Sequence, residues 1–227
     1  LFRSAAELGM ERVGRQVVGP ARDQPPQEAR AVILQPDDDG GLVDGQPAFR
    51  HPVPRRAKGI DETRLAAETP RQYVERLARE KAAAGWHMLQ QAGLPAHPVL
   101  AADTTVALGD EIFGKPVDAA DARAMLLKLS GTTHEVLTAV AVRLDARTEV
   151  VLSVSQVTFA ALTDSWIDAY IATGEPFDKA GGYGIQGLAG LFAQRLDGSF
   201  TGVMGLPLHE TAVLLAKAGL GFLAKSR

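Results

Sequence analysis

The chain has 227 residues, of which 46% are hydrophobic and 22% charged, as is ordinary for a globular protein of one large domain or two small ones. Its formal net charge of −3 gives no basic footprint for nucleic acid or membranes, and its lack of cysteine excludes disulfides, thiolate catalysis and cysteine-ligated zinc. The sequence contains neither an apolar run near the ~20 residues of a membrane span nor an opening signal peptide, so we expect a cytoplasmic protein with no membrane or nucleic-acid partner.

Residues 1–58 differ in composition from the remainder. They contain seven of the 13 prolines and an acidic, glycine-containing stretch at 37–41, and their only candidate strand is the short run 31–34. Poor periodicity and high proline content are typical of weakly ordered segments, although an ordinary run of irregular loops explains them equally well. We therefore divide the chain into an atypical, weakly ordered N-terminal segment, 1–58, and a folded domain, 59–227.

A helix is predicted over residues 70–91, since Thr69 followed by Pro70 is an N-cap signal and Gly93 stops the apolar repeat. At about 100° per residue, Lys81 falls within the apolar arc of this helix. A lysine in that position either lays its alkyl stem along apolar surface, with its ammonium in water, or points the ammonium into a site. The first arrangement is the more frequent, so the helix alone assigns Lys81 no function.

The run 98–108 consists of small and β-branched apolar residues with one carboxylate, Asp103, in its middle. Bounded by Pro98 and the turn signal at Gly109, it predicts a buried strand. An ionised carboxylate inside such a strand needs a partner, a proton, a metal or an opening into a cleft, because its unpaired burial costs several kcal/mol. Asp103 is therefore a structural turn residue or, as its position favours, a metal-binding or proton-accepting group.

The remaining elements follow from periodicity and turn signals. They are a strand 111–113, a helix 119–129, hairpin strands 134–144 and 149–160, a helix 164–172 capped by Asp164, and a final helix 207–218. Gly114 and Pro116 fix the backbone beside Lys115, so its side chain can be aimed, whereas His134 is interpreted as a structural or surface residue. From Gly174 to Gly205, nine glycines interleave with apolar residues, which indicates backbone close to a ligand.

A series of short motifs runs in collinear order through about residues 60–218. They are Ile60-Asp61-Glu62-Thr63, Tyr73-Val74-Glu75-Arg76-Leu77-Ala78 with Lys81-Ala82, Ala102-Asp103-Thr104, Gly114-Lys115-Pro116, Leu129-Ser130-Gly131 with His134, Gly174-Glu175-Pro176, Asp178-Lys179-Ala180-Gly181, Gly184-Ile185-Gln186-Gly187 and Gly205-Leu206-Pro207-Leu208. Each motif alone is weak, but the ordered set is specific, and it resembles the Maf family of nucleoside triphosphate pyrophosphatases. The resemblance implies an α/β fold like that of the inosine triphosphatases: a long mixed β-sheet flanked by helices, with a central cleft.

The resemblance also implies an activity and a site. The stretch 178–187, with glutamine rather than the glutamate of the 7-methyl-GTP branch at Gln186, is similar to the branch that acts on dTTP and UTP. Homodimers are common in the family. The implied roles are Asp103 as proton acceptor, Lys81 and Lys115 as further catalytic residues, Thr104 and Gln186 as specificity positions, and Glu62 with Asp103 as ligands of a divalent cation, Mg²⁺ or Mn²⁺. Water would attack the α-phosphorus of a nucleoside triphosphate and release pyrophosphate.

One departure from the family pattern concerns the opening of the chain. The family begins with a Ser-x-Ser-Pro-Arg-Arg loop that binds the triphosphate. The most similar stretch here is Val53-Pro54-Arg55-Arg56, so the resemblance implies only Arg55 and Arg56 as substrate-binding residues. Residues 1–58 are either a replacement or a translation in the wrong frame. Two functions stay open: an active pyrophosphatase for dTTP, UTP and modified pyrimidine nucleotides, favoured by the other site residues, and a catalytically impaired nucleotide-binding or cell-division regulatory protein, favoured by the missing loop.

Overall fold

The computed structural model describes residues 60–220 and the strand Val32–Leu34. Its helices and strands are β1 (Val32–Leu34), α1 (Pro70–Gln91), β2 (Val99–Leu108), β3 (Glu111–Phe113), α2 (Ala119–Leu129), β4 (Thr133–Leu144), β5 (Arg147–Phe159), α3 (Asp164–Ala172), the 3-10 turns η3 (Glu175–Asp178), η4 (Ala180–Gly182) and η5 (Leu188–Leu191), β6 (Ala193–Asp197), α4 (Phe200–Val203) and α5 (Leu208–Lys217). Among the helices of residues 60–220, none has the length and apolar content that crossing a lipid bilayer requires.

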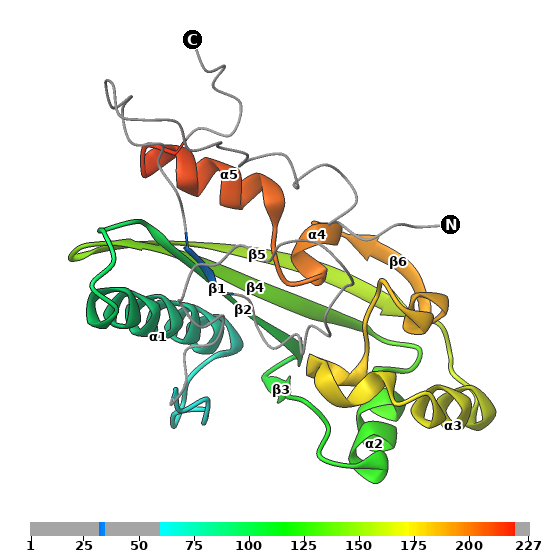
Figure 1. Ribbon diagram of the computed structural model, residues 1–227. Coiled ribbons are helices and arrows are strands. Elements are labelled where there is room, and N and C mark those ends of the chain that lie inside the picture. Colours follow the sequence, from blue (N-terminus) through cyan, green and yellow to red (C-terminus); the bar gives the residue numbers. More distant parts are fainter. Residues whose placement is uncertain (1–31, 35–59, 221–227) are drawn as a thin grey trace, which may run out of the picture.

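The strands form one mixed sheet in the order β1-β2-β4-β5-β6, with β3 paired to β2 (Figure 1). β1 runs parallel to β2, and every other pair is antiparallel. β4 and β5 are 12 and 13 residues long and turn at Asp145, which takes a positive φ of 53°, a conformation that aspartate tolerates better than most residues. The expected mixed sheet flanked by helices is confirmed.

β1 and β3 leave part of one edge of β2 without a strand partner. β4 pairs with residues 99–107 along the other edge, so β1 and β3 must share this one. The pairing with β1 ends at Ala101 and that with β3 begins at Val106. Within the described part of the chain, residues 102–105 are therefore unpaired by any strand on this edge, and their outward backbone groups have no ladder partner there.

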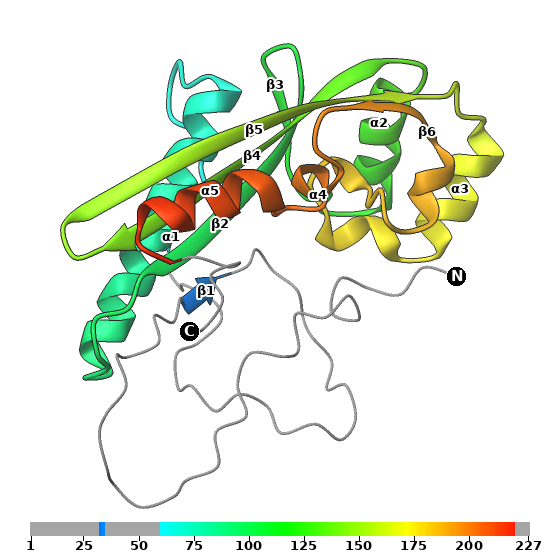
Figure 2. The ribbon, with the colours of Figure 1, turned by 90° about the horizontal axis from the view of Figure 1, so that it is seen from above.

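Different helices cover the two faces of the sheet (Figures 1 and 2). On the α1 face, small residues of β2 and β4 receive the buried side of α1; this layer comprises Val74, Ala78, Ala82, Trp86, Leu89, Val99, Ala101, Ala107, Leu137, Ala139 and Ala141. On the opposite face, α5 packs on the intervening residues; that layer comprises Leu100, Ala102, Val140, Val142, Leu214 and Leu215. α2, α3 and the 3-10 turns pack on the far end of that opposite face. Alternate residues of each strand thus serve separate layers, as the pleat requires.

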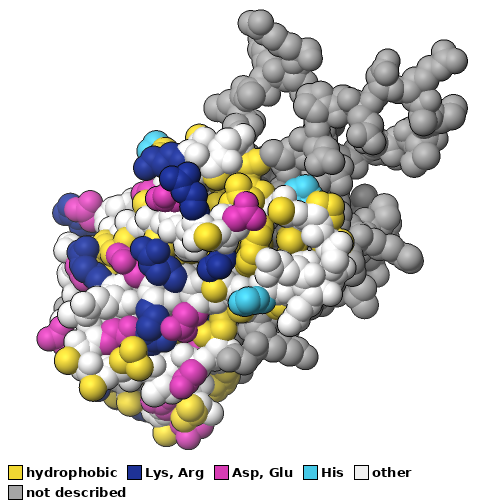
Figure 3. Space-filling model, turned by 90° about the vertical axis from the view of Figure 1, so that its left-hand side faces the viewer, with side chains coloured by type: hydrophobic (Ala, Val, Ile, Leu, Met, Phe, Trp, Pro, Cys, Tyr) yellow, Lys and Arg dark blue, Asp and Glu magenta, His cyan; other side chains and the backbone are white. Residues whose placement is uncertain are grey.

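Charged side chains of both signs are interspersed on one end of the molecule. Figure 3 shows the end of the molecule that lies at the left of Figure 1, where basic and acidic side chains alternate instead of gathering by sign. Exposed ion pairs join neighbouring elements, as when Arg123 of α2 pairs with Asp164 and Asp168 of α3. Such pairs contribute ~0–1 kcal/mol each, so the packed layers supply most of the stability of the fold.

Most predicted elements are confirmed, and the exceptions have local causes. α1 has the predicted bounds, and Thr69 and Gln72 form a reciprocal capping box at its start. The prediction that Asp164 caps α3 is wrong, because the Thr163 hydroxyl accepts the Trp166 N–H and Asp164 is already helical. β6 and α4 were not predicted, because both are short and lie in the glycine-rich stretch. The apolar residues there follow neither the two-residue repeat of a strand nor the 3.6-residue repeat of a helix.

His134 is a structural residue inside an aromatic cluster. Its Nε2 lies 2.7 Å from Tyr183 Oη, and its ring meets those of Phe159 and Tyr183 edge-on. The side chain is 1% exposed, and its Nδ1 has no hydrogen-bond partner among residues 60–220. Burial lowers the pKa of His134 to about 4, because the imidazolium would lose its hydration there.

We expect protonation of His134 to lower the free energy of unfolding as the pH drops from about 6.5 towards 4, and His134→Gln to remove this contribution, which Asp103 opposes in the wild type and the variant alike. The unfolded chain binds a proton at His134 near pH 6.5, whereas the folded chain does so only near 4, so protonation in this window favours unfolding. The full difference corresponds to roughly 3 kcal/mol. Urea unfolding across this range checks it, with His87→Gln on the exposed side of α1 as control. Parallel curves for wild type and His134→Gln would contradict the prediction.

Candidate functional site

Glu62, Lys81 and Asp103, hereafter the Asp103 cluster, meet on the α1 face of the sheet. Lys81 Nζ lies 2.5 Å from Asp103 Oδ1 and 2.8 Å from Glu62 Oε1. Asp103 comes from the middle of β2, Lys81 from the middle of α1, and Glu62 from the segment that precedes α1. The side chains of Lys81 and Asp103 are only 16% and 7% exposed. Of the two arrangements open to Lys81, the structure therefore has the one that points the ammonium into a site.

The burial of this cluster changes its proton affinities. Burial raises the pKa of Asp103 to about 6, and the Lys81 ammonium opposes that rise without cancelling it. Burial alone would lower the pKa of Lys81, but the neighbouring Asp103 and Glu62 carboxylates outweigh it and raise the pKa. A carboxylate that is ionised at neutral pH, yet more basic than usual, has the proton affinity that suits a general base.

The segment that carries Glu62 is anchored to α1 by two side chains for which the sequence predicts no role. Tyr73 Oη donates to the Glu62 carbonyl at 3.0 Å, and Arg76 donates to the Thr63 carbonyl at 3.1 Å. Arg76 also makes two hydrogen bonds, of 2.7 and 3.0 Å, to the carboxylate of Glu68. Because Tyr73 and Arg76 are three residues apart on one helix, they share a side of it, and this spacing is the signal that could have identified them.

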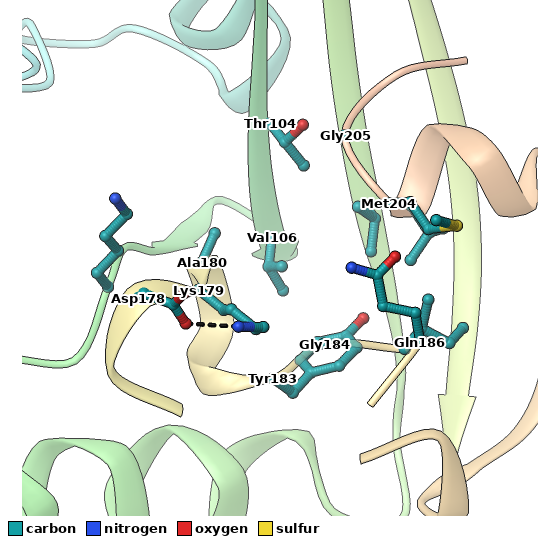
Figure 4. Close-up of a pocket in the computed structure, with 14 residues that line it drawn as sticks. Thr104, Val106, Asp178, Lys179, Ala180, Tyr183, Gly184, Gln186, Met204 and Gly205 are labelled. Atoms are coloured by element: carbon teal, nitrogen blue, oxygen red, sulfur yellow. Dashed lines mark hydrogen bonds and ion pairs between the residues drawn. The ribbon is translucent and has the colours of Figure 1, made fainter. Parts of the chain in front are cut away.

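A cavity of about 200 Å³, hereafter the Gln186 pocket, opens on the opposite face of the sheet. Its lining comprises Thr104, Val106, Lys115, Val136, Asp178, Lys179, Ala180, Tyr183, Gly184, Ile185, Gln186, Val203, Met204 and Gly205. Figure 4 shows the amide of Gln186 directed into the cavity, towards the end where Thr104 lies. Gln186 is exposed, and its amide makes no hydrogen bond within the described residues. Three residues named from the sequence, Thr104, Lys115 and Gln186, therefore share one pocket.

The glycine-rich wall of this pocket lies close to the sheet. A Cβ at Gly181, whose φ is +70°, would stand 3.0 Å from the side chain of Val106 in β2, so glycine is required there. The N–H of Gly181 donates to the Gly114 carbonyl at 3.0 Å, which ties the wall to the segment that carries Lys115. The close approach found here is thus between the wall and the protein's own strand.

Asp103 and Thr104 are consecutive in β2 and therefore point to opposite faces of the sheet. The structure consequently separates the predicted residues into the Asp103 cluster on one face and the Gln186 pocket on the other. Residues 102–105, the edge of β2 that no described strand pairs, carry both Asp103 and Thr104. Arg55 and Arg56 lie outside the described residues.

The acidic residues of the cluster fit a divalent cation that arrives with a phosphate ligand. The carboxylates of Glu62 and Asp103 converge on one point, where the Lys81 ammonium now lies. Residues 60–220 hold no group of three histidine or acidic side chains able to bind a metal alone. One or two carboxylates are nevertheless the usual protein share of a Mg²⁺ site, because substrate phosphates and water complete it. Lys81 would have to turn aside, towards the phosphates.

Known proteins resemble this chain over the region that carries these residues. Residues 48–218 match the family model described as Maf-like protein. A relative from Chromobacterium violaceum, named dTTP/UTP pyrophosphatase, is 57% identical over 160 residues, which are 70% of this chain and 81% of the relative. Relatives of the same name from Dechloromonas aromatica and Aromatoleum aromaticum are 57% and 54% identical over 159 and 172 residues, covering 79% and 84% of their lengths and 70% and 76% of this chain. The matched region contains both halves of the site.

Proposed function

Because the chain belongs to the Maf family, we propose that it is a nucleoside triphosphate pyrophosphatase that hydrolyses dTTP and UTP to the monophosphate and pyrophosphate. The observation that carries this proposal is the Asp103 cluster: a buried carboxylate paired with a lysine on a strand segment whose outer edge no described strand pairs. The shared name of relatives more than half identical to the chain supports the choice of substrate. A cytoplasmic location is part of the proposal.

In this proposal, Asp103 takes a proton from the attacking water. The water oxygen bonds to the α-phosphorus, the bond to the bridging oxygen breaks, and pyrophosphate leaves with that oxygen. Lys81 and Lys115, from the two faces of the sheet, neutralise charge on the phosphate oxygens. Glu62 and Asp103 would hold Mg²⁺ or Mn²⁺, and the cation would supply further charge neutralisation. Proton acceptance of this kind is worth about 10²–10⁴-fold in rate.

The Gln186 pocket is assigned to the nucleoside end of the substrate. Its volume of about 200 Å³ is below the ~300–1,000 Å³ of pockets that enclose whole ligands, so it suits one end of a nucleotide. An amide offers both a donor and an acceptor, and Gln186 can therefore bind the edge of a pyrimidine. A phosphate chain leaving the pocket would cross the edge at residues 102–105 to reach Asp103.

A pyrophosphate-release assay tests this function. The full chain should hydrolyse dTTP and UTP in the presence of Mg²⁺ or Mn²⁺, and a chelator should remove that activity. CTP, GTP and dATP, assayed at the same concentration, should be poorer substrates. Equal turnover of all five nucleotides would contradict the assignment, and so would the absence of any turnover.

We expect Gln186→Glu to lower kcat/KM for dTTP and UTP about tenfold or more while the Tm changes little. The side chain is exposed and makes no hydrogen bond within residues 60–220, so the fold does not depend on it. Glutamate lacks the amide donor and adds a negative charge beside a polyanionic substrate. Gln90→Glu, an equal change at the exposed end of α1, should leave turnover unchanged. A loss that is the same for every nucleotide and follows the Tm would identify Gln186 as structural.

The opening of the chain motivates a second candidate, a catalytically impaired nucleotide-binding or regulatory protein. The sequence has no Ser-x-Ser-Pro-Arg-Arg motif, and Arg55 and Arg56 alone are assigned to the triphosphate. We propose that 59–227 is the pyrophosphatase domain and 1–58 an atypical N-terminal segment. A chimera whose first 58 residues are replaced by a family opening with that motif should release pyrophosphate faster. Equal rates for the chimera and the native chain would show that the motif is dispensable here.

A further inference from the structure

A buried threonine of β4, Thr138, links the Gln186 pocket to α4 through two hydrogen bonds. Its Oγ1 lies 2.7 Å from the backbone carbonyl oxygen of Gly202 and 2.9 Å from Oγ1 of Thr104. Thr104 and Thr138 are direct partners in the antiparallel register of β2 and β4, so their side chains stand together on the pocket face. Thr138 is 0% exposed, whereas Thr104 lines the cavity.

These contacts fix the direction of both hydroxyl protons. A carbonyl oxygen only accepts, so the Thr138 hydroxyl donates its one proton to Gly202. Thr138 Oγ1 then has only lone pairs for Thr104, and the Thr104 hydroxyl must donate to it. The proton of Thr104 is thereby used, and its hydroxyl offers only lone pairs to the cavity. The opposite arrangement would place two acceptors 2.7 Å apart in a buried site.

We propose that Thr138 is a positioning residue that holds Thr104 as a hydrogen-bond acceptor, so that the pocket selects a ligand that donates there. This proposal rests on the proposed function. The donor is then the imide N3–H of a 2,4-dioxopyrimidine, the base of dTTP and UTP. Cytosine has an unprotonated N3 at the same place. The lone pair of this nitrogen would face the lone pairs of the Thr104 hydroxyl, a mismatch that binding sites reject strongly. Gln186 cannot make this distinction alone, because its amide can present either its donor or its acceptor.

Thr138 also helps to anchor α4, and this purely structural role needs a matched control. α4 is held a second time where the Ser199 N–H donates to Ser155 Oγ at 2.9 Å. Ser155→Ala removes that anchor without touching Thr104. Thr138→Val removes the hydroxyl at nearly constant shape and leaves Thr104 free to turn its proton to the cavity. Thr138→Ser keeps the hydroxyl.

The test measures kcat/KM for UTP and CTP, and binding of UMP and CMP by calorimetry, in the full chain and in these three variants. Thr138→Val should reduce the preference for uracil over cytosine about tenfold, while Thr138→Ser should retain it and Ser155→Ala should change both nucleotides alike. An unchanged preference in Thr138→Val, or an equal loss of preference in Ser155→Ala, would overturn the inference.

Two further measurements keep the inference apart from its premise and from folding. UMP should bind to the wild type about tenfold more tightly than N3-methyl-UMP, which lacks the donor, whereas methylation at C5, in dTMP compared with dUMP, should change little. This comparison needs no variant, so it tests the requirement for a donor at N3 even if Thr138→Val does not fold, and Thr138→Ser and Ser155→Ala then test the role of Thr138. Equal binding of UMP and N3-methyl-UMP would overturn the inference, while selective binding without any pyrophosphate release would contradict only the proposed function.

Discussion

Replacing Asp103 with asparagine should lower pyrophosphate release from dTTP and UTP by about 10²–10⁴-fold while the protein keeps its fold. Asparagine has the size of aspartate, and its oxygen can still accept from the Lys81 ammonium that now lies 2.5 Å away. It cannot take a proton from water. The structure does not need the charge, because burial already disfavours the ionised form of Asp103.

The control for this variant is Asp110→Asn, which makes the same change in the exposed turn between β2 and β3. It should leave turnover unchanged. Circular dichroism and Tm measurements establish that both variants are folded. Full turnover in a folded Asp103→Asn protein would remove Asp103 from the mechanism.

Lys81→Met should destabilise the protein by about 3 kcal/mol at pH 8 and should also remove most of the activity. The substitution leaves the Asp103 carboxylate, 7% exposed, without its partner, and breaking a buried pair on one side typically costs about 3–5 kcal/mol. Loss of the Lys81 ammonium raises the folded pKa of Asp103, already about 6 in the wild type, further above its unfolded value near 3.9. The folded variant therefore binds more protons than the unfolded chain over a wider pH range. Stability is therefore retained at low pH and lost as the pH rises through the folded pKa.

A double variant separates the loss of charge pairing from the loss of packing. Lys81→Met with Asp103→Asn has no unpaired buried charge, so most of the lost stability should return while the activity should not. Lys128→Met, which breaks an ion pair whose side chains are about half exposed, should cost less than about 1 kcal/mol. Urea unfolding at pH 5 and pH 8 measures these differences. A double variant as unstable as Lys81→Met alone would mean that the lysine acts through packing.

Local signals in the sequence were sufficient for the elements that frame the site, but not for the contacts within it. Thr69 and Pro70 predict the start of α1, and the composition of 98–108 predicts β2, because capping and burial leave a direct mark on neighbouring residues. That Lys81 meets Asp103 across 22 positions is a tertiary fact, and helical periodicity alone favoured a solvated lysine. The resemblance to a family supplied that grouping.

The hydrogen-bond chain from Thr104 through Thr138 to Gly202 could not be predicted from the sequence, for a different reason. It depends on the register of two strands and on the placement of α4, a helix of four residues with no periodic pattern of its own. The roles of Tyr73 and Arg76 were easier to predict, since their spacing on α1 is visible in the sequence. Their targets are carbonyl groups, which every residue carries, so no residue type marks them.

The adjacency of Asp103 and Thr104 in β2 makes strand alignment a condition of function. One peptide unit separates the residue assigned to chemistry from the residue assigned to base selection, and a slip of β2 by one position would exchange the faces on which they stand. The long ladder with β4, from Val99 to Ala107, holds that alignment. Single-residue insertions within 99–103 should therefore be far more harmful than insertions at the distant tip of the β4–β5 hairpin, where Asp145 turns into solvent.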